Sequence, residues 1–425
     1  MRKEPEQTPP SGRKTSAAKP AKTTANTAAN TATNTAAPSR RPRVALVLQG
    51  GGALGAYQAG VYQALHEHDL TPDWVIGTSI GAINAALIAG NPRETRIARL
   101  REFWDTVAHP DLFDLRQVPD TLRPLATRLT TLDTFLRGAP GFFRPRPFNA
   151  FAAGLPVPPE EASFYSTAEL QETLSRLVDF DYLNGASGIR MTVSAVKVTC
   201  GTLVNFDSQA RPIGPEHVMA SGALPPGFAP VRVDGELYWD GGLYSNTPLE
   251  VVLNDEPRTN LLCMMVDLWH ADGPEPRTLE EVQTREKDVT FASRSQRHID
   301  AYLQQYRLRR AAHALYKRLP RELLTQEDRQ MMAELGADTT IHIVRLAYAG
   351  RDWNMASKDV NFARGSVQWR WEQGYQDGLR GIALGQGCPF SESDTGIVVH
   401  DLPSGETHVA PSRAARMAKA TERSS

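Results

Sequence analysis

Cysteine is scarce in this chain of 425 residues. Cys200, Cys263 and Cys388 are widely spaced and form no C-x-x-C pair, which argues against a disulfide framework and a cysteine-built zinc site. No apolar run reaches the length of about 18 residues that a membrane span needs, and residues 1–43 contain no signal-peptide core. The formal net charge of −1 gives no reason to expect a nucleic-acid partner. We therefore expect a water-soluble, cytoplasmic globular protein.

Apolar periodicity is also missing at both ends of the chain. Residues 1–42 are polar and basic and include the tract TTANTAANTATNTAAP, and residues 396–425 are again polar. Both segments are expected to be disordered tails. The N-terminal tail has two interpretations: a solvated extension without a role, or a tether to anionic lipid or an export address that needs no signal peptide.

Strand-like and helix-like segments alternate from Arg43 onward. Residues 44–49 are a short apolar run, and residues 53–66 follow with apolar side chains at helical spacing. Residues 74–77 and 82–89 repeat this strand-to-helix order, which predicts a parallel sheet covered by helices. Further strands are expected at 191–198, 231–239, 261–268 and 340–348, and long basic helices at 279–320.

These elements predict an α/β protein with a three-layer α/β/α core and a mainly parallel sheet over residues 43–350. The stretch 106–164 is rich in proline and aromatic residues and is interpreted as a lid insertion. Residues 351–395 are assigned to a C-terminal accessory segment.

Gly77-Thr78-Ser79-Ile80-Gly81 forms a G-x-S-x-G pattern between a predicted strand and a predicted helix. In such a turn a serine is held in a strained conformation, and glycines two residues away on each side remove Cβ atoms that would clash. The Ser79 hydroxyl would then project at the C-terminal edge of the sheet, beside the positive end of the helix. A tight turn with an incidental serine is the alternative that these residues leave open.

Gly50, Gly51 and Gly52 follow the first strand and open a helix, so that backbone N–H groups can converge on a negative oxygen. In a serine hydrolase this oxygen is the oxyanion of the tetrahedral intermediate. With Gly55 the same glycines spell G-x-G-x-x-G, the fingerprint of dinucleotide binding. That alternative needs an acidic residue at the end of the second strand, where this chain has Gly77-Thr78-Ser79.

Ser79 needs a base, and none of the ten histidines lies in an obvious catalytic loop. Asp240 follows the predicted strand 231–239, where an α/β sheet places its active-site loops. Gly241 and Gly242 permit a turn that directs this carboxylate inward. A solvent-facing β-turn is the alternative for the same three residues.

Together these three motifs resemble the patatin-like phospholipase family, and the segment 220–226 (ASGALPP) is similar to the loop that precedes the aspartate strand there. The resemblance covers residues 43–267 and implies a patatin-like hydrolase core. It implies a Ser79–Asp240 dyad without histidine, in which Ser79 is the nucleophile and Asp240 the general base. The remaining implied site residues are an oxyanion hole at Gly50, Gly51 and Gly52, elbow glycines Gly77 and Gly81, and a supporting turn at Gly241 and Gly242.

The implied reaction is hydrolysis of fatty-acyl esters of lipids, with phospholipids as the leading substrates, through an acyl-enzyme. The resemblance implies no metal or organic cofactor, and a lipid or membrane surface in place of a nucleic-acid partner. One departure is Leu54, which stands where many members carry Arg or Lys to meet an anionic head group. Residues 361–379 resemble a segment added in a bacterial branch of the family, which predicts a bacterial source.

Four phenylalanines and the basic helices each allow two interpretations from the sequence. Phe142, Phe143, Phe148 and Phe151 either line an acyl trough or belong to the core, and the basic helices at 279–320 either dock on an anionic interface or expose a solvated face. At the level of function, the alternatives are a nucleotide-binding oxidoreductase that uses the Gly50–Gly55 loop, and a catalytically silent lipid-binding module.

Overall fold

The computed structural model describes residues 42–110, 129, 132–146, 154–256, 258–335, 339–350, 357–386 and 396–402, and it leaves the side chains of 293–298 undescribed. Within these ranges the helices are η1 Gly52–Gly55, α1 Ala56–Glu67, α2 Ile80–Ala89, α3 Arg96–Val107, η2 Pro159–Glu161, α6 Ala168–Leu177, α7 Phe180–Asn184, α8 Pro215–Ser221, η3 Gly241–Leu243, α9 Leu249–Leu253, α10 Leu279–Arg318, η4 Arg321–Leu323, α11 Gln326–Leu335, η5 Lys358–Val360 and α12 Arg364–Gln386.

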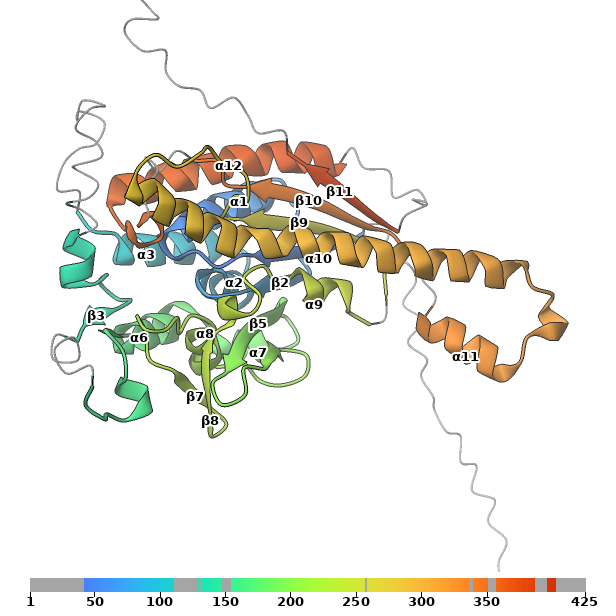
Figure 1. The fold of residues 1–425 in the computed structure, drawn as a ribbon, viewed down its shortest axis with the longest axis horizontal. Helices are drawn as coiled ribbons and strands as arrows, with labels where there is room; N and C mark the ends of the chain where they lie inside the picture. The colour runs from blue at the N-terminus through green and yellow to red at the C-terminus, as the bar shows by residue number, and fades with distance from the viewer. Residues whose placement is uncertain are drawn as a thin grey trace, which may run out of the picture. The chain divides into compact units, whose positions relative to one another are not determined.

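A mixed sheet of nine strands organises the described part of the chain (Figure 1). Its strands are β1 Arg43–Leu48, β2 Trp74–Gly77, β5 Arg190–Lys197, β6 Leu203–Asp207, β7 Val231–Val233, β8 Glu236–Asp240, β9 Leu261–Asp267, β10 Ile341–Ala347 and β11 Ile397–Asp401. Their order is β11-β10-β9-β1-β2-β5-β8-β7, with β6 paired to β5. All pairs from β11 to β5 along this path are parallel, whereas β6, β7 and β8 are paired antiparallel. A separate hairpin joins β3 Arg144–Pro145 to β4 Tyr165–Ser166.

The sheet is buried on both faces. Along β1, Val44, Leu46 and Leu48 belong to one apolar cluster together with residues of α1 and α2, whereas Ala45 and Val47 belong to a second cluster with residues of α9 and α10. This alternation follows from the two-residue period of a strand. The predicted α/β architecture with a mainly parallel sheet and helices on both faces is therefore confirmed.

Two segments differ from the strands predicted. The stretch 231–239 forms two short antiparallel strands, β7 and β8, joined by a tight turn at Asp234 and Gly235, which both have positive φ. The Asp-Gly pair is a strong signal for such a hairpin. Residues 397–401, assigned to a tail from the sequence, form β11, which extends the sheet parallel to β10. The parts of both tails at 1–41 and 403–425 lie outside the described residues.

The segment assigned as a C-terminal accessory packs on the core through α12, which lies alongside α1 (Figure 1). The two helices approach closely at glycines: a Cβ built on Gly374 would overlap the carbonyl oxygen of Tyr57, and one built on Gly60 would overlap that of Trp371. Glycine permits this contact because it has no side chain. α12 is thus interlocked with the helix that follows the Gly50–Gly52 turn.

We expect Gly374→Ala to lower the free energy of unfolding by about 2–3 kcal/mol, because the added methyl group must force α12 away from the α1 backbone. Gly385→Ala in the same helix is the matched control, since a Cβ there meets its nearest atom at 3.5 Å, an ordinary contact. Helix propensity alone should stabilise that variant by up to about 1 kcal/mol. Urea unfolding measures both, and equal stabilities would contradict the interlock.

Candidate active site

Ser79 lies at the sharp turn between β2 and α2, as the G-x-S-x-G pattern predicts. Its φ of 58° and ψ of −125° are strained for a residue with a side chain. The turn is tight enough that a Cβ on Gly77 would overlap the carbonyl oxygen of Gly81, and a Cβ on Gly81 would overlap that of Leu48. Partly exposed Ser79 therefore precedes the first turn of α2, where helix dipoles favour negative charge.

Asp240 ends β8 and reaches the same edge of the sheet. Gly77 is opposite Val193 in the β2–β5 pairing, and Asp240 is opposite Ala195, two residues further along β5. This register brings Asp240 to the level of the turn that follows Gly77. The carboxylate is 2% exposed, and its Oδ1 accepts a hydrogen bond from the Gly242 N–H at 2.7 Å.

The Ser79 side chain lies close enough to the Asp240 carboxylate to lower the pKa of that group. Burial raises the pKa of Asp240 to about 7, although the Ser79 side chain and the hydrogen bond from the Gly242 N–H lower it. A base with a pKa near the working pH has both the right protonation state and the driving force to accept a proton. The arrangement can therefore move a proton from the serine to the aspartate near neutral pH.

The glycine turn after β1 runs directly beside Ser79, because a Cβ built on Gly50 would lie 3.1 Å from the Ser79 Cβ. The Gly50 N–H donates to the Asn246 carbonyl oxygen at 3.1 Å. The N–H groups of Gly51 and Gly52 have no acceptor among the described residues. Gly52 has a φ of 55°, which favours glycine. Of the three predicted oxyanion donors, two have a free N–H in this conformation and Gly50 does not.

The segment 220–226 contacts both Ser79 and Asp240. The backbone N–H of Ser79 donates to the carbonyl oxygen and to the Oγ of Ser221, at 3.1 Å each, and the Ser221 hydroxyl donates to the Ser194 carbonyl at 2.7 Å. The Asp240 N–H donates to the Ala223 carbonyl at 3.0 Å. The segment thus fixes the backbone of the serine and of the aspartate relative to each other.

Three polar residues that the sequence analysis missed hold the glycine turn in place. The Gly50 carbonyl accepts hydrogen bonds from the Asn246 amide at 3.0 Å and from the Trp269 indole at 2.8 Å. Buried Gln49 accepts from the Trp269 N–H at 3.1 Å and donates to Thr247 Oγ1 at 2.7 Å. A glutamine at the end of an apolar strand was the only local signal for this network, because its partners are about 200 residues away in sequence.

Leu54 and two of the four phenylalanines named in the sequence are buried. Leu54 is fully buried in the apolar core, so no polar side chain takes the place of the Arg or Lys of other members. Phe142 and Phe143 are buried in an aromatic cluster with Phe228 and Phe362, which favours a packing role for them. Phe148 and Phe151 lie outside the described residues.

No group of three or more His, Cys, Asp or Glu side chains in the described ranges is placed to hold a metal ion. Of the helices described, none combines the length and the apolar composition needed to cross a membrane.

Comparison with known proteins shows two matches to family profiles. Residues 46–253 match the profile described as patatin-like phospholipase, and residues 289–385 match one described as patatin phospholipase. A patatin-like phospholipase domain-containing protein of Pyricularia oryzae is 38% identical over 91 residues, which cover 17% of this chain and 12% of that protein. The triacylglycerol lipase ptl3 of Schizosaccharomyces pombe is 44% identical over 59 residues, or 14% of this chain and 12% of the lipase.

Among solved structures, VipD from Legionella pneumophila is similar with a TM-score of 0.37 and 14% identity, over 81% of this chain and 67% of that chain. Human GIVD cytosolic phospholipase A2 is similar with a TM-score of 0.32 and 9% identity, over 81% of this chain and 59% of that chain. The matched stretches of the two curated relatives are short, but the two family profiles agree and together reach from β1 to the end of α12. The chain belongs to the patatin-like phospholipase family.

Proposed function

We propose that this protein hydrolyses fatty-acyl ester bonds of lipids, with glycerophospholipids as the leading substrates, through an acyl-enzyme on Ser79. The observation that carries the proposal is the strained serine at the start of α2, which lies beside a buried aspartate whose pKa is raised to about 7. Membership of the patatin-like phospholipase family supports a lipid as the substrate.

In the proposed reaction Asp240 accepts the hydroxyl proton of Ser79 while the serine oxygen attacks the ester carbonyl carbon. The N–H groups of Gly51 and Gly52, which have no acceptor among the described residues, stabilise the oxyanion together with the positive end of α2. Protonated Asp240 then gives its proton to the departing alcohol oxygen as the acyl–oxygen bond breaks. Asp240 next deprotonates a water molecule, which attacks the acyl carbon. Asp240 then gives this proton to the Ser79 oxygen as the acyl–serine bond breaks, which releases the fatty acid.

The two alternatives make different predictions. A nucleotide-binding oxidoreductase needs an acidic residue at the end of β2, and Gly77 and the elbow occupy that place. A silent lipid-binding module would bind lipid without turnover and would tolerate replacement of Ser79. The interaction of the Ser79 side chain with the Asp240 carboxylate favours catalysis over silence.

One face of α10 supports a lipid surface as the site of action. Leu308 and Leu315 are 72% and 62% exposed, and their spacing of seven residues places them on one side of the helix, whose C-cap residue Leu319 is 51% exposed. The stretch 301–321 has no acidic residue but six cations: Arg307, Arg309, Arg310, Lys317, Arg318 and Arg321. An exposed apolar stripe flanked by cations fits an anionic interface.

Labelling with an alkyl fluorophosphonate tests the nucleophile. The wild type should take up one label, and Ser79→Ala should take up none, because the probe reacts only with an activated serine. Ser175→Ala on α6 is the control, since this exposed serine is remote from the turn and only bonds to the Gln171 carbonyl. Persistent labelling of Ser79→Ala would contradict the proposal, and lipid binding without labelling or turnover would favour the silent module.

A further inference from the structure

Residues of the C-terminal segment pack directly on the glycine turn. A Cβ built on Gly52 would overlap the backbone carbonyl oxygen of Asp359 in η5. Gly52 also has a positive φ of 55°, which favours glycine at this position. The position of η5 therefore limits where the Gly51 and Gly52 N–H groups can lie.

Two ion pairs join η5 to α10. Lys287 Nζ lies 2.9 Å and 3.0 Å from the two carboxylate oxygens of Asp359, and Lys358 Nζ lies 2.6 Å from Asp288 Oδ1. Each element thus contributes one lysine and one aspartate in adjacent positions. We call these four residues the α10–η5 clamp. Their side chains are 14% to 32% exposed, so the pairs are partly shielded from water.

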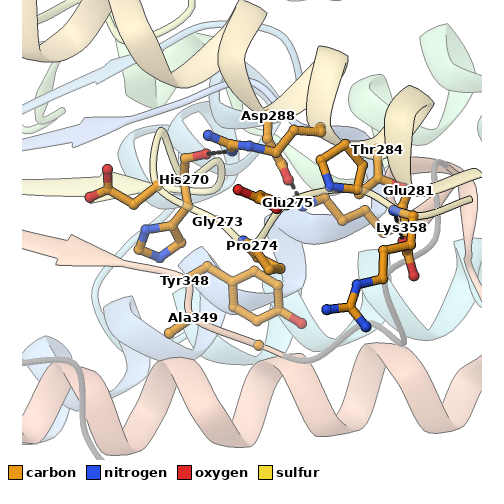
Figure 2. A pocket seen from close by; sticks show the side chains of 15 residues that line it. His270, Gly273, Pro274, Glu275, Glu281, Thr284, Asp288, Tyr348, Ala349 and Lys358 are labelled. Atoms are coloured by element: carbon orange, nitrogen blue, oxygen red, sulfur yellow. Dashed lines mark hydrogen bonds and ion pairs between the residues drawn. The ribbon is translucent and has the colours of Figure 1, made fainter.

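A cavity of about 660 Å³ lies beside the clamp, between α10, the loop after β9 and the loop after β10 (Figure 2). Asp288 and Lys358 line it, and their ion pair crosses between the two elements. Ser79, Asp240 and Gly50–Gly52 are not among its lining residues. On this side, the ion pair between Lys358 and Asp288 joins η5 to α10.

The clamp also reaches the other end of the glycine turn through Trp269. The Trp269 indole donates to the Gly50 carbonyl, and Lys358 Nζ lies 5.0 Å from the centroid of the indole ring. From the opposite side, the fully buried guanidinium of Arg370 in α12 donates to the carbonyl oxygens of Lys358 and Asn361, at 2.9 Å each. Contacts with α10 and with α12 thus fix η5, which packs against the glycine turn.

We propose that the α10–η5 clamp positions the oxyanion donors, so that Lys287, Asp288, Lys358 and Asp359 are positioning residues for ester hydrolysis. This inference rests on the proposed function, because it assigns the Gly51 and Gly52 N–H groups to the oxyanion. Loss of one oxyanion donor typically costs about 10²–10³-fold in kcat, and a misplacement of about 1 Å can have a similar effect. Loosening the clamp shifts both donors relative to Ser79 without touching either member of the dyad.

The test uses the full-length protein and a soluble short-chain ester, so that binding to a lipid surface does not enter. Lys287→Met and Asp359→Asn should each lower kcat by about 10–100-fold while KM changes by less than about twofold. Inhibition by an alkyl boronic acid, whose tetrahedral adduct on Ser79 uses the oxyanion donors, should weaken by a similar factor. Lys287→Arg, which keeps the charge, should retain near-normal kcat.

Charge exchange separates positioning from general destabilisation. The double variant Lys287→Glu/Asp359→Lys should recover kcat to within a few fold of the wild type, because the ion pair is restored in reverse. Glu160→Gln is the matched control, because it removes a more exposed ion pair with Arg232 that is remote from the turn. It should leave kcat unchanged.

Folded clamp variants with wild-type kcat and boronate inhibition would overturn the inference. If a single variant does not fold, the charge-exchanged pair and Lys287→Arg decide the question. A folded charge-exchanged pair whose kcat stays low would also overturn the inference. If the wild type neither labels nor hydrolyses the ester, the proposed function itself fails and the inference fails with it.

Discussion

Asp240→Asn is expected to abolish ester hydrolysis and, at pH 8, to make the folded protein more stable than the wild type. The amide cannot accept the Ser79 proton, so kcat should fall by at least about 10³-fold. The gain in stability arises because burial raises the pKa of the Asp240 carboxyl to about 7. Holding a buried charge at pH 8 therefore costs the fold on the order of 4 kcal/mol, which a neutral amide avoids.

The pH dependence follows from the direction of this shift. Between about pH 4 and pH 7 the folded state holds a proton on Asp240 that the unfolded state has released, so wild-type stability from this group falls as pH rises through that window. The advantage of Asp240→Asn in urea unfolding should accordingly be smaller at pH 5 than at pH 8. Wild-type kcat/KM should rise with pH and level off above about 7.

Asp267→Asn provides the contrast for this measurement. Burial raises the pKa of Asp267 as well, although Arg345 lowers it. Its Oδ2 accepts from Arg345 Nε at 2.7 Å, so its replacement removes a partner of a shielded cation, and this loss should outweigh the relief of burial. That variant should lose stability at pH 8. If the Asp240→Asn protein is less stable than the wild type at pH 8, the Asp240 carboxylate stabilises the folded state, and the expected cost of its burial is contradicted.

Gly52→Ala is expected to reduce kcat by about 10²–10³-fold with little change in KM. The added methyl group would overlap the Asp359 carbonyl oxygen, and alanine disfavours a φ of 55°. The turn must then shift, and its N–H groups leave the position where the oxyanion forms. Steady-state kinetics on a soluble ester measure the effect without interference from binding to a lipid surface.

Gly201→Ala separates backbone strain from the contact with η5. Gly201 has a similar φ of 68°, but no atom lies within 4 Å of a Cβ built there. Its replacement should cost about 1 kcal/mol of stability and leave kcat unchanged. A Gly52→Ala enzyme that keeps more than a tenth of wild-type kcat would rule out the contact between η5 and the turn as a determinant of rate.

The parts of the site that were predictable from sequence are those set by local pattern. The β2 strand at 74–77 has the predicted bounds, and β1 differs from its prediction by one residue at each end, because short apolar runs next to glycines identify buried strands well. The strained turn at Ser79 follows from two glycines and one serine at fixed spacing. The predicted placement of Asp240 at the end of a strand was also correct, although that strand is half of a hairpin.

The remaining features depend on contacts between residues far apart in sequence. Asn246 and Trp269 follow the glycine turn by about 200 residues, and no pattern around either indicates that both bond to the Gly50 carbonyl. The glycine motif likewise gives no indication that the Gly50 N–H donates to the Asn246 carbonyl oxygen. β11 was assigned to a tail because an edge strand of five residues in polar surroundings carries too weak a period to be recognised.

The contact between Gly52 and η5 also bears on biosynthesis, which proceeds from the N-terminus. Gly52 and Asp359 are roughly 300 residues apart, so at about 5–20 residues per second their translation is separated by roughly 15–60 s. Ser79 and Asp240 are both translated within that interval, before η5 and α12 exist. A nascent chain that already holds Ser79 and Asp240 therefore lacks the contact between η5 and the glycine turn. Under the proposed mechanism, its ester hydrolysis should stay weak until η5 and α12 have been synthesised.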